Sequence, residues 1–214
     1  MVHRTPFFFP LLYPSLLWRV PAVEKEIYLT FDDGPVHGPT EFVLESLATF
    51  GAKATFFCIG DNVRKHPEVF RRIILQGHAV GNHTFHHLNG WKHKANAYTA
   101  DVRQCQQTMA SQFGANGQVY ISRLFRPPYG RISRQQIHVL KQEYTIVMWD
   151  VLSIDYNKHL SPEKCLKNTI QTTRPGSIVV FHDSVKAEKN MMYALPRVLD
   201  HFTEQGYTFK PLPG

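Results

Sequence analysis

The chain has 214 residues, of which 43% are hydrophobic and 13% aromatic, so we expect one globular domain with a sizeable core rather than a disordered chain. The formal charge of +7 is spread along the sequence without a run of five or six basic residues, which argues against a nucleic-acid-binding surface. Three cysteines without C-x-x-C spacing argue against a disulfide framework and a thiolate zinc site, and we expect buried, inert thiols.

Residues 1–26 are expected to form an N-terminal arm that packs on a domain of residues 27–214. The apolar stretch 7–18 is interrupted by Pro10 and Pro14, is not followed by an A-x-A cleavage site, and is too short to span a membrane. It is therefore not a convincing secretion signal, and the compartment stays open between the cytoplasm and the cell envelope.

After the arm, short apolar strands alternate with segments of helical periodicity. The first helix is expected to begin with Thr40 as its cap and to end at Gly51, and Ser161 and Pro162 give a similar start signal to a later helix. The predicted strands cover residues 27–31, 54–59, 79–82, 124–126, 144–151, 177–181 and 207–210, and the predicted helices cover residues 40–50, 67–76, 101–112, 161–174 and 193–204.

Seven β/α alternations without a sequence repeat predict an α/β fold, in which helices cover a parallel sheet. The sheet is expected either to close as an irregular barrel or to be doubly wound. In both arrangements the active site lies at the carboxyl ends of the strands. Functional side chains should therefore follow several strands directly.

Polar clusters do follow the predicted strands. The first strand ends in T-F-D-D-G-P, which contains Asp32 and Asp33, and later strands are followed by G-N-H-T-F-H-H, R-P-P-Y-G, S-I-D-Y and F-H-D-S. Asp-Gly is also a common turn dipeptide, which is the ordinary explanation of the aspartate pair taken alone. Clusters at equivalent ends of five strands instead indicate a functional site.

Two histidines within these clusters have the spacing of a metal-ligand pair. His83 and His87 are four residues apart, which would place both imidazoles on one side of a helical turn. One added aspartate gives two nitrogen ligands and one oxygen ligand, and leaves coordination positions for water and substrate. We expect His86 to be exposed to solvent, and His78 and His138 to serve packing or surface roles.

In order and spacing, T-F-D-D-G-P, H-T-x-x-H, R-P-P-Y-G, S-I-D-Y and V-x-H resemble the five motifs of the polysaccharide deacetylase family, also called NodB-homology or carbohydrate esterase family 4. The resemblance covers about residues 27–210. It implies an irregular (β/α)7 barrel, similar to a TIM barrel. It also implies a metal-dependent hydrolase that removes acetyl groups from N-acetylated amino sugars of peptidoglycan, chitin-like or related glycans through a metal-activated water.

The resemblance implies that Asp33, His83 and His87 bind one divalent metal ion. Zinc is the expected ion, and these ligand types would also accept Co²⁺, Ni²⁺ or Mn²⁺. The neighbouring carboxylates would then have separate tasks, because Asp33 binds the ion while Asp32 accepts a proton from the activated water.

The resemblance also assigns the remaining catalytic residues. It implies that Asp32 is the general base and His182 the general acid. The residues implied to assist them are Arg126, which holds the base, Tyr129, whose backbone N–H stabilises the oxyanion, and Asp155, which supports the acid.

The sequence departs from the family pattern at three positions. Leu152 stands where the fourth motif, D-x-x-D-W, has its first aspartate, and Tyr156 replaces its tryptophan. Val180 replaces the usual leucine of the fifth motif. The fourth-motif changes alter the aromatic wall of the site and bear on substrate shape more than on the reaction, whereas Val180 is a mild apolar change.

Three other functions are compatible with part of this pattern. The same machinery would serve an O-acetyl esterase acting on acetylated xylan-like polysaccharides. Two histidines and a carboxylate also suit non-haem iron oxygenases, although the β/α alternation argues against their usual antiparallel sandwich. A silent carbohydrate-binding module would not need the complete set of proton-transfer residues. We expect a monomer whose partner is an N-acetylated glycan or amino sugar, without nucleic acid and without a transmembrane segment.

Overall fold

A curled parallel sheet forms the centre of the protein. The computed structural model describes residues 3–21, 24–113 and 121–213. Within these ranges, eight strands form one sheet in the order β5-β4-β3-β2-β1-β7-β6, and β8 pairs with β1; every strand pair is parallel. The strands are β1 (Glu26–Asp32), β2 (Thr55–Cys58), β3 (Ala79–Asn82), β4 (Leu124–Phe125), β5 (Thr145–Ile146), β6 (Val151–Leu152), β7 (Ile178–His182) and β8 (Thr208–Phe209).

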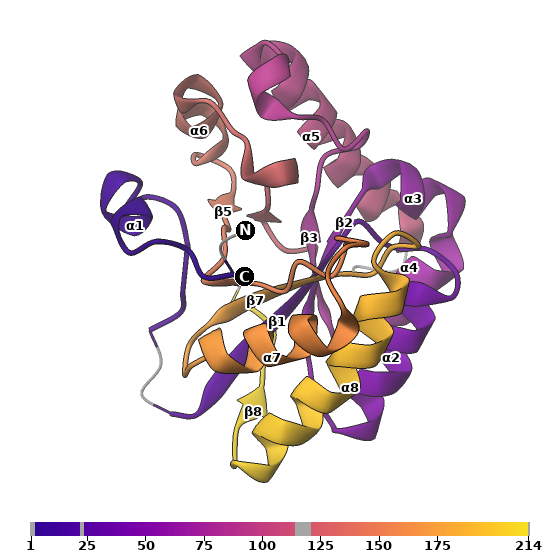
Figure 1. Ribbon diagram of the computed structural model, residues 1–214. Coiled ribbons are helices and arrows are strands. Elements are labelled where there is room, and N and C mark those ends of the chain that lie inside the picture. The colour runs from indigo at the N-terminus through magenta and orange to yellow at the C-terminus, as the bar shows by residue number, and fades with distance from the viewer. Residues whose placement is uncertain (1–2, 22–23, 114–120, 214) are drawn as a thin grey trace.

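Helices surround this sheet, with α2 and α8 close together on one side and α1 set apart on another (Figure 1). The predicted α/β fold and its irregular (β/α)7 barrel arrangement are confirmed. The helices are α1 (Phe8–Leu12), α2 (Pro39–Thr49), α3 (Gly60–Lys65), α4 (Pro67–Leu75), α5 (Ala95–Ala110), α6 (Arg134–Leu140), α7 (Pro162–Thr172) and α8 (Glu188–Glu204), with 3-10 turns at Gly90–Lys92, Ser111–Phe113 and Pro128–Gly130.

The two ends of the sheet are joined by one short segment. The single strand predicted over 144–151 is wrong, because the chain forms β5 at one sheet edge and β6 at the other, with residues 147–150 between them. The N-terminal arm pairs with this connection: the N–H of Leu17 donates to the carbonyl of Ile146 (2.9 Å), and the N–H of Met148 donates to that of Leu17 (2.7 Å). The arm thus supplies backbone partners where the sheet lacks a strand.

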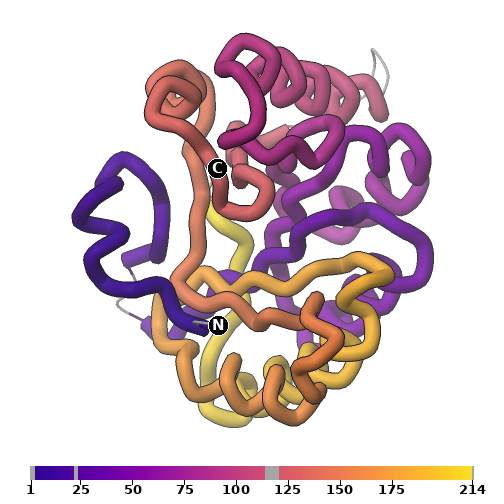
Figure 2. The backbone as a smooth tube through the Cα atoms, turned by 45° about the horizontal axis from the view of Figure 1, so that its top comes forward, coloured from indigo at the N-terminus to yellow at the C-terminus, as the bar shows by residue number. Residues whose placement is uncertain are grey.

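Residues of the arm predicted at 1–26 make further contacts with the sheet, and positions 1–2 and 22–23 of that prediction lie outside the described residues. Figure 2 shows the indigo arm beside the orange segment around β6. No helix in the described ranges has the length and apolar character needed to cross a membrane. The isolated bridges between the arm and the rest of the chain are Arg4–Val151, Leu17–Val147 and Arg19–Ser177.

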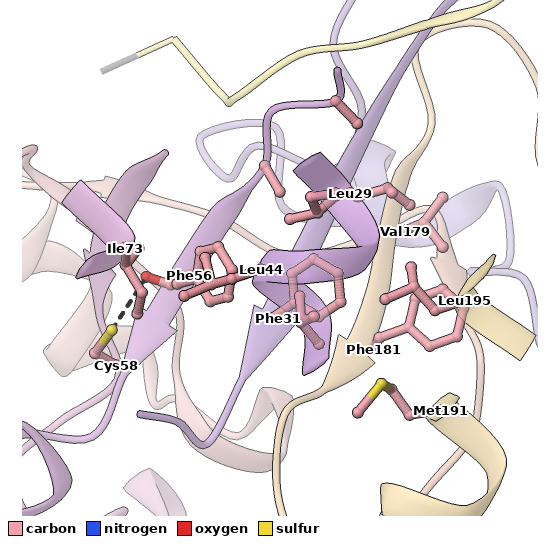
Figure 3. Close-up of a cluster of buried hydrophobic side chains, with 14 of the residues drawn as sticks. Leu29, Phe31, Leu44, Phe56, Cys58, Ile73, Val179, Phe181, Met191 and Leu195 are labelled. Carbon is pink, nitrogen blue, oxygen red and sulfur yellow. Dashed lines mark hydrogen bonds between the residues drawn. The ribbon is translucent and has the colours of Figure 1, made fainter. Parts of the chain in front are cut away.

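The largest core cluster lies between the sheet and helices α2 and α8. Phe31 on β1 stacks on Phe56 of β2 and on Phe181 of β7, with ring centroids 5.1 and 6.2 Å apart. Leu44 of α2 and Leu195 of α8 are fully buried in the same cluster (Figure 3). Full burial of such a side chain stabilises the fold by about 1.5–3 kcal/mol. The three cysteines are buried and free, as predicted: Cys58, Cys105 and Cys165.

Several helices differ from their predicted extents. The helix predicted at 101–112 begins earlier, as α5, and the one predicted at 193–204 begins earlier, as α8. Helices α1, α3 and α6 were not predicted. The six residues of α3 are too few for an apolar stripe to be recognised. In contrast, α6 carries a recognisable start signal, a capping box between Ser133 and Gln136.

Candidate active site

The two adjacent aspartates lie at the carboxyl end of β1, in the centre of the sheet. Asp32 is in register with Phe57 of β2 on one side and with His182 of β7 on the other. Asp33 has a φ of 82°, a left-handed conformation that side-chain-bearing residues rarely adopt. Asp32 contacts a buried arginine, whereas Asp33 contacts two histidines.

Asp32 is held by Arg126, the residue that the family resemblance places beside it. The Arg126 guanidinium is fully buried, and its Nη1 donates to Asp32 Oδ1 at 2.7 Å and to Thr30 Oγ1 at 2.7 Å. Its Nη2 donates to the carbonyl of Met148 at 2.8 Å, and the guanidinium lies 4.2 Å from the centroid of the Phe57 ring. A carboxylate held in this way has a defined orientation and a compensating charge.

His83 and His87 both face Asp33, but they do not lie on a helical turn. That part of the prediction is wrong: the segment after β3 is irregular, and Thr84 and His87 have φ values of 63° and 55°. The carboxylate of Asp101 holds this segment, accepting from the backbone N–H of His86 and lying 2.6 Å from His86 Nδ1. His86 itself is solvent-exposed, as predicted (side chain 58% exposed).

Asp33, His83 and His87 form a compact group of potential metal ligands. Asp33 Oδ1 lies 3.2 Å from His87 Nε2 and 3.7 Å from His83 Nε2, and one ligand atom from each residue lies within 4.8 Å of the others. His83 Nδ1 is 2.8 Å from the carbonyl of Arg126, so an Nδ1–H donates there and Nε2 keeps its lone pair.

The protonation states of this group also fit a divalent cation. Burial is the main reason that the pKa of His83 is lowered to about 4, so its imidazole is neutral at neutral pH. Burial alone would raise the pKa of Asp33, but the hydrogen bond from His87 and the charges of His182 and His83 lower it. A neutral imidazole and an ionised carboxylate are the forms that bind metals.

His182 lies at the end of β7 and is paired with Asp155. Its Nδ1 is 2.7 Å from Asp155 Oδ1, and its backbone N–H donates to Asp155 Oδ2 at 2.7 Å. Burial alone would lower the pKa of His182, but the charge and hydrogen bond of Asp155, with Asp33 and Asp32, raise it to about 9. The imidazolium can therefore persist at neutral pH and donate a proton from Nε2.

One cavity of about 470 Å³ is lined by Asp32, Asp33, His83, His87 and His182. Tyr129, which is 61% exposed, stands at its rim, and its ring centroid lies 4.7 Å from that of His87. The family-pattern departures Leu152, Tyr156 and Val180 also line it, together with Trp149. Non-glycine residues with positive φ are concentrated in and around this cavity, and each such backbone conformation costs about 1–3 kcal/mol of folding free energy. In the described ranges these residues are Asp33, Thr84, His87, Tyr129 and Ile154.

The sequence interpretation missed Asp183, which shapes the turn after Asp33. Asp183 is fully buried; it accepts from the backbone N–H of Gly34 at 2.9 Å and from the hydroxyl of Thr40 at 2.6 Å. The prediction that Thr40 caps α2 is therefore wrong. The N-cap of α2 is Gly38. A Cβ at Gly34 would overlap the Asp183 carboxylate. The F-H-D-S cluster at the end of β7 was the available signal for this role.

Comparison with known proteins gives consistent relatives. A family model described as polysaccharide deacetylase matches residues 19–145. The chain is 31% identical over 195 residues to a peptidoglycan-N-acetylglucosamine deacetylase of Bacillus cereus (90% of this chain, 69% of that protein). It is 31% identical over 207 residues to a chitooligosaccharide deacetylase of Azorhizobium caulinodans (91% and 96%). A solved peptidoglycan N-acetylglucosamine deacetylase, in complex with 4-naphthalen-1-yl-N-oxidanyl-benzamide, superimposes with a TM-score of 0.87 and 30% identity (98% and 95% of the two chains).

Proposed function

The chain belongs to the polysaccharide deacetylase family, and we propose that it hydrolyses N-acetyl groups of amino sugars, releasing acetate and a free amine. One observation carries this proposal: Asp33, His83 and His87 converge on a cavity that also contains Asp32 and His182. The parallel sheet does not match the antiparallel sandwich expected of a non-haem iron oxygenase. A carbohydrate-binding module would not require a buried ion pair between Arg126 and Asp32, or a nearby histidine, His182, whose pKa is raised.

We propose that Asp33, His83 and His87 hold one divalent cation. The observations that support this are the donor set of two imidazoles and one carboxylate, and the Nδ1–H of His83 that points to a backbone carbonyl. Such a cation supplies Lewis acidity, which favours ionisation of water and polarises the acetyl carbonyl. The donors suit zinc and several neighbouring metals.

The side chains then divide the proton transfers. Asp32, oriented by Arg126, accepts the proton of the attacking water as the water oxygen bonds to the acetyl carbon. The backbone N–H of Tyr129 donates to the carbonyl oxygen as negative charge develops there. His182 Nε2 donates its proton to the amide nitrogen as the carbon–nitrogen bond breaks, because Asp155 occupies its Nδ1 side. The products are acetate and the amino sugar.

The test is release of acetate and amine from chitooligomers, peptidoglycan fragments and acetylated xylan, by metal-stripped protein and after each metal is added. Asp32→Asn should retain stoichiometric metal but lose activity by roughly 10²–10⁴. Asp33→Ala should lose both metal and activity, and Asp61→Asn, which breaks only surface ion pairs, should lose neither. Release from acetylated xylan alone would assign an O-acetyl esterase instead, and full metal content in Asp33→Ala would refute the ligand assignment.

A further inference from the structure

A second cavity, of about 300 Å³, adjoins the catalytic one. Four residues line both: Tyr129, Gly130, Trp149 and Leu152. Gly130 has a φ of 63°, and a Cβ there would come within 2.6 Å of the Trp149 ring. Because Gly130 has no side chain, the Trp149 ring can lie against the turn that carries Tyr129, and both residues line the two cavities.

The N-terminal arm forms one wall of this second cavity, here called the arm cavity. Its apolar arm residues are Pro6, Phe9, Tyr13, Leu16 and Trp18. Further apolar lining outside the arm comes from Trp91, Ile132, Ile137 and Met148. Trp91 is 67% exposed, so the cavity opens to solvent there, whereas Leu16 and Met148 are nearly buried and form its inner surface. All three tryptophans of the chain line this cavity.

Four polar side chains that line the arm cavity, those of Arg4, Thr5, Trp18 and Trp91, have partners within the described part of the protein. The Thr5 hydroxyl donates to the carbonyl of Trp149 at 2.7 Å. The indole N–H of Trp18 donates to the carbonyl of Tyr13 at 3.1 Å, and that of Trp91 to the carbonyl of Ile132 at 3.2 Å. Arg4, which also lines the cavity, lies 3.5 Å from the Asp150 carboxylate.

The mainly apolar and aromatic lining of the arm cavity favours an apolar ligand over a second sugar ring. A sugar ring carries several hydroxyls, and a hydroxyl buried without a partner costs about 1–3 kcal/mol. An alkyl or aromatic group has no such requirement, and its transfer from water to apolar walls is favourable. The catalytic cavity differs, because it offers carboxylates and imidazoles to a polar ligand.

We propose that the arm cavity binds the apolar aglycone of an amphiphilic N-acetylated amino sugar, while the catalytic cavity holds its acetamido group. This inference rests on the proposed deacetylase function and narrows its substrate class. It makes Phe9 and its neighbours on the arm determinants of specificity, without a part in the proton transfers.

The test compares monomeric methyl and octyl 2-acetamido-2-deoxy-β-D-glucopyranoside. Each methylene moved from water into the arm cavity favours binding by about fourfold, so kcat/KM should be at least about tenfold higher for the octyl glycoside. Phe9→Ser should reduce this preference by about fourfold or more, and leave the rate on the methyl glycoside unchanged. Phe7→Ser is the matched control, because Phe7 is 82% exposed and does not line the arm cavity.

Tryptophan fluorescence gives a second measurement that does not depend on turnover, because every tryptophan lines the arm cavity. The octyl glycoside should change the emission and bind more tightly than the methyl glycoside. Equal binding and equal turnover of the two glycosides would overturn the inference and leave the deacetylase function standing. Preferential octyl binding without any acetate release would support the apolar site and refute the deacetylase function. A preference for chitobiose that Phe9→Ser abolishes would assign the cavity to a second sugar and overturn the inference.

Discussion

Substitution of Asp155 by asparagine should move the alkaline limb of the activity profile to lower pH. Asp155 is 1% exposed, and both of its carboxylate oxygens lie 2.7 Å from nitrogens of His182. Asparagine has nearly the same shape but no charge. It removes the partner that holds the pKa of His182 near 9 against the opposing effect of burial.

The size of the effect follows from this pKa. In the proposed mechanism His182 donates a proton, so activity should fall as the pH rises through the pKa of His182. A carboxylate at this distance raises a histidine pKa by about 1–3 units. Without it, the pKa of His182 should fall from about 9 to about 6–8, and the alkaline limb of the activity profile should move with it. For a pKa of about 7, the protonated fraction at about pH 8.5 falls from roughly three-quarters to roughly 3%, a loss of about 25-fold. At about pH 6 the titration lowers activity only slightly.

The assay is kcat/KM for amine release from a chitooligomer across this pH range, with Asp150→Asn as the control. Asp150 is also buried, but it contacts Ser177 and Arg174 rather than a catalytic group. In the Asp150→Asn control, the alkaline limb of the activity profile should lie at the same pH as in the wild type. A loss of activity in Asp155→Asn by the same factor at every pH would indicate structural damage alone, and would refute the role assigned to Asp155.

Three other predictions concern stability and metal binding. Arg126→Met should lower the free energy of unfolding by about 3–5 kcal/mol, because it leaves the buried Asp32 carboxylate unpaired. Arg103→Met, which removes only a surface ion pair, should leave the free energy of unfolding nearly unchanged, and denaturant titration measures both. Leu44→Ala should lower the free energy of unfolding by about 2–5 kcal/mol, because it leaves a cavity in the core. Leu75 is 78% exposed, so Leu75→Ala should lower it by about 0.5 kcal/mol or less in the same titration. Excess zinc at about 100 times its Kd should raise the free energy of unfolding of the wild type by about 2.7 kcal/mol, and that of Asp33→Ala by much less; equal gains would place the ion elsewhere.

Sequence reasoning succeeded where one local signal carried the information. The apolar strand ending in two aspartates became β1, and the Ser161–Pro162 start signal became the N-terminus of α7. The rule that parallel strands direct their carboxyl ends to one edge of the sheet then brought Asp32 and His182 into direct register. The resemblance supplied their proposed roles.

The failures share a physical cause, because tertiary contacts decided the local structure. The apolar run 144–151 has the composition of one strand, but its centre pairs with Leu17 of the arm and divides into β5 and β6. The spacing of His83 and His87 suits a helix, yet Asp101 holds an irregular loop instead. The periodicity of apolar residues in the sequence does not indicate either of these tertiary contacts. The arm cavity likewise depends on residues more than 100 positions apart.

Anomalous diffraction from crystals of the zinc-loaded protein would locate the bound ion relative to Asp33, His83 and His87. We expect one strong peak per chain, about 2.0–2.2 Å from the Asp33 carboxylate and from Nε2 of both His83 and His87. Active, stoichiometrically loaded protein whose only peak lies away from these three side chains would contradict this expectation.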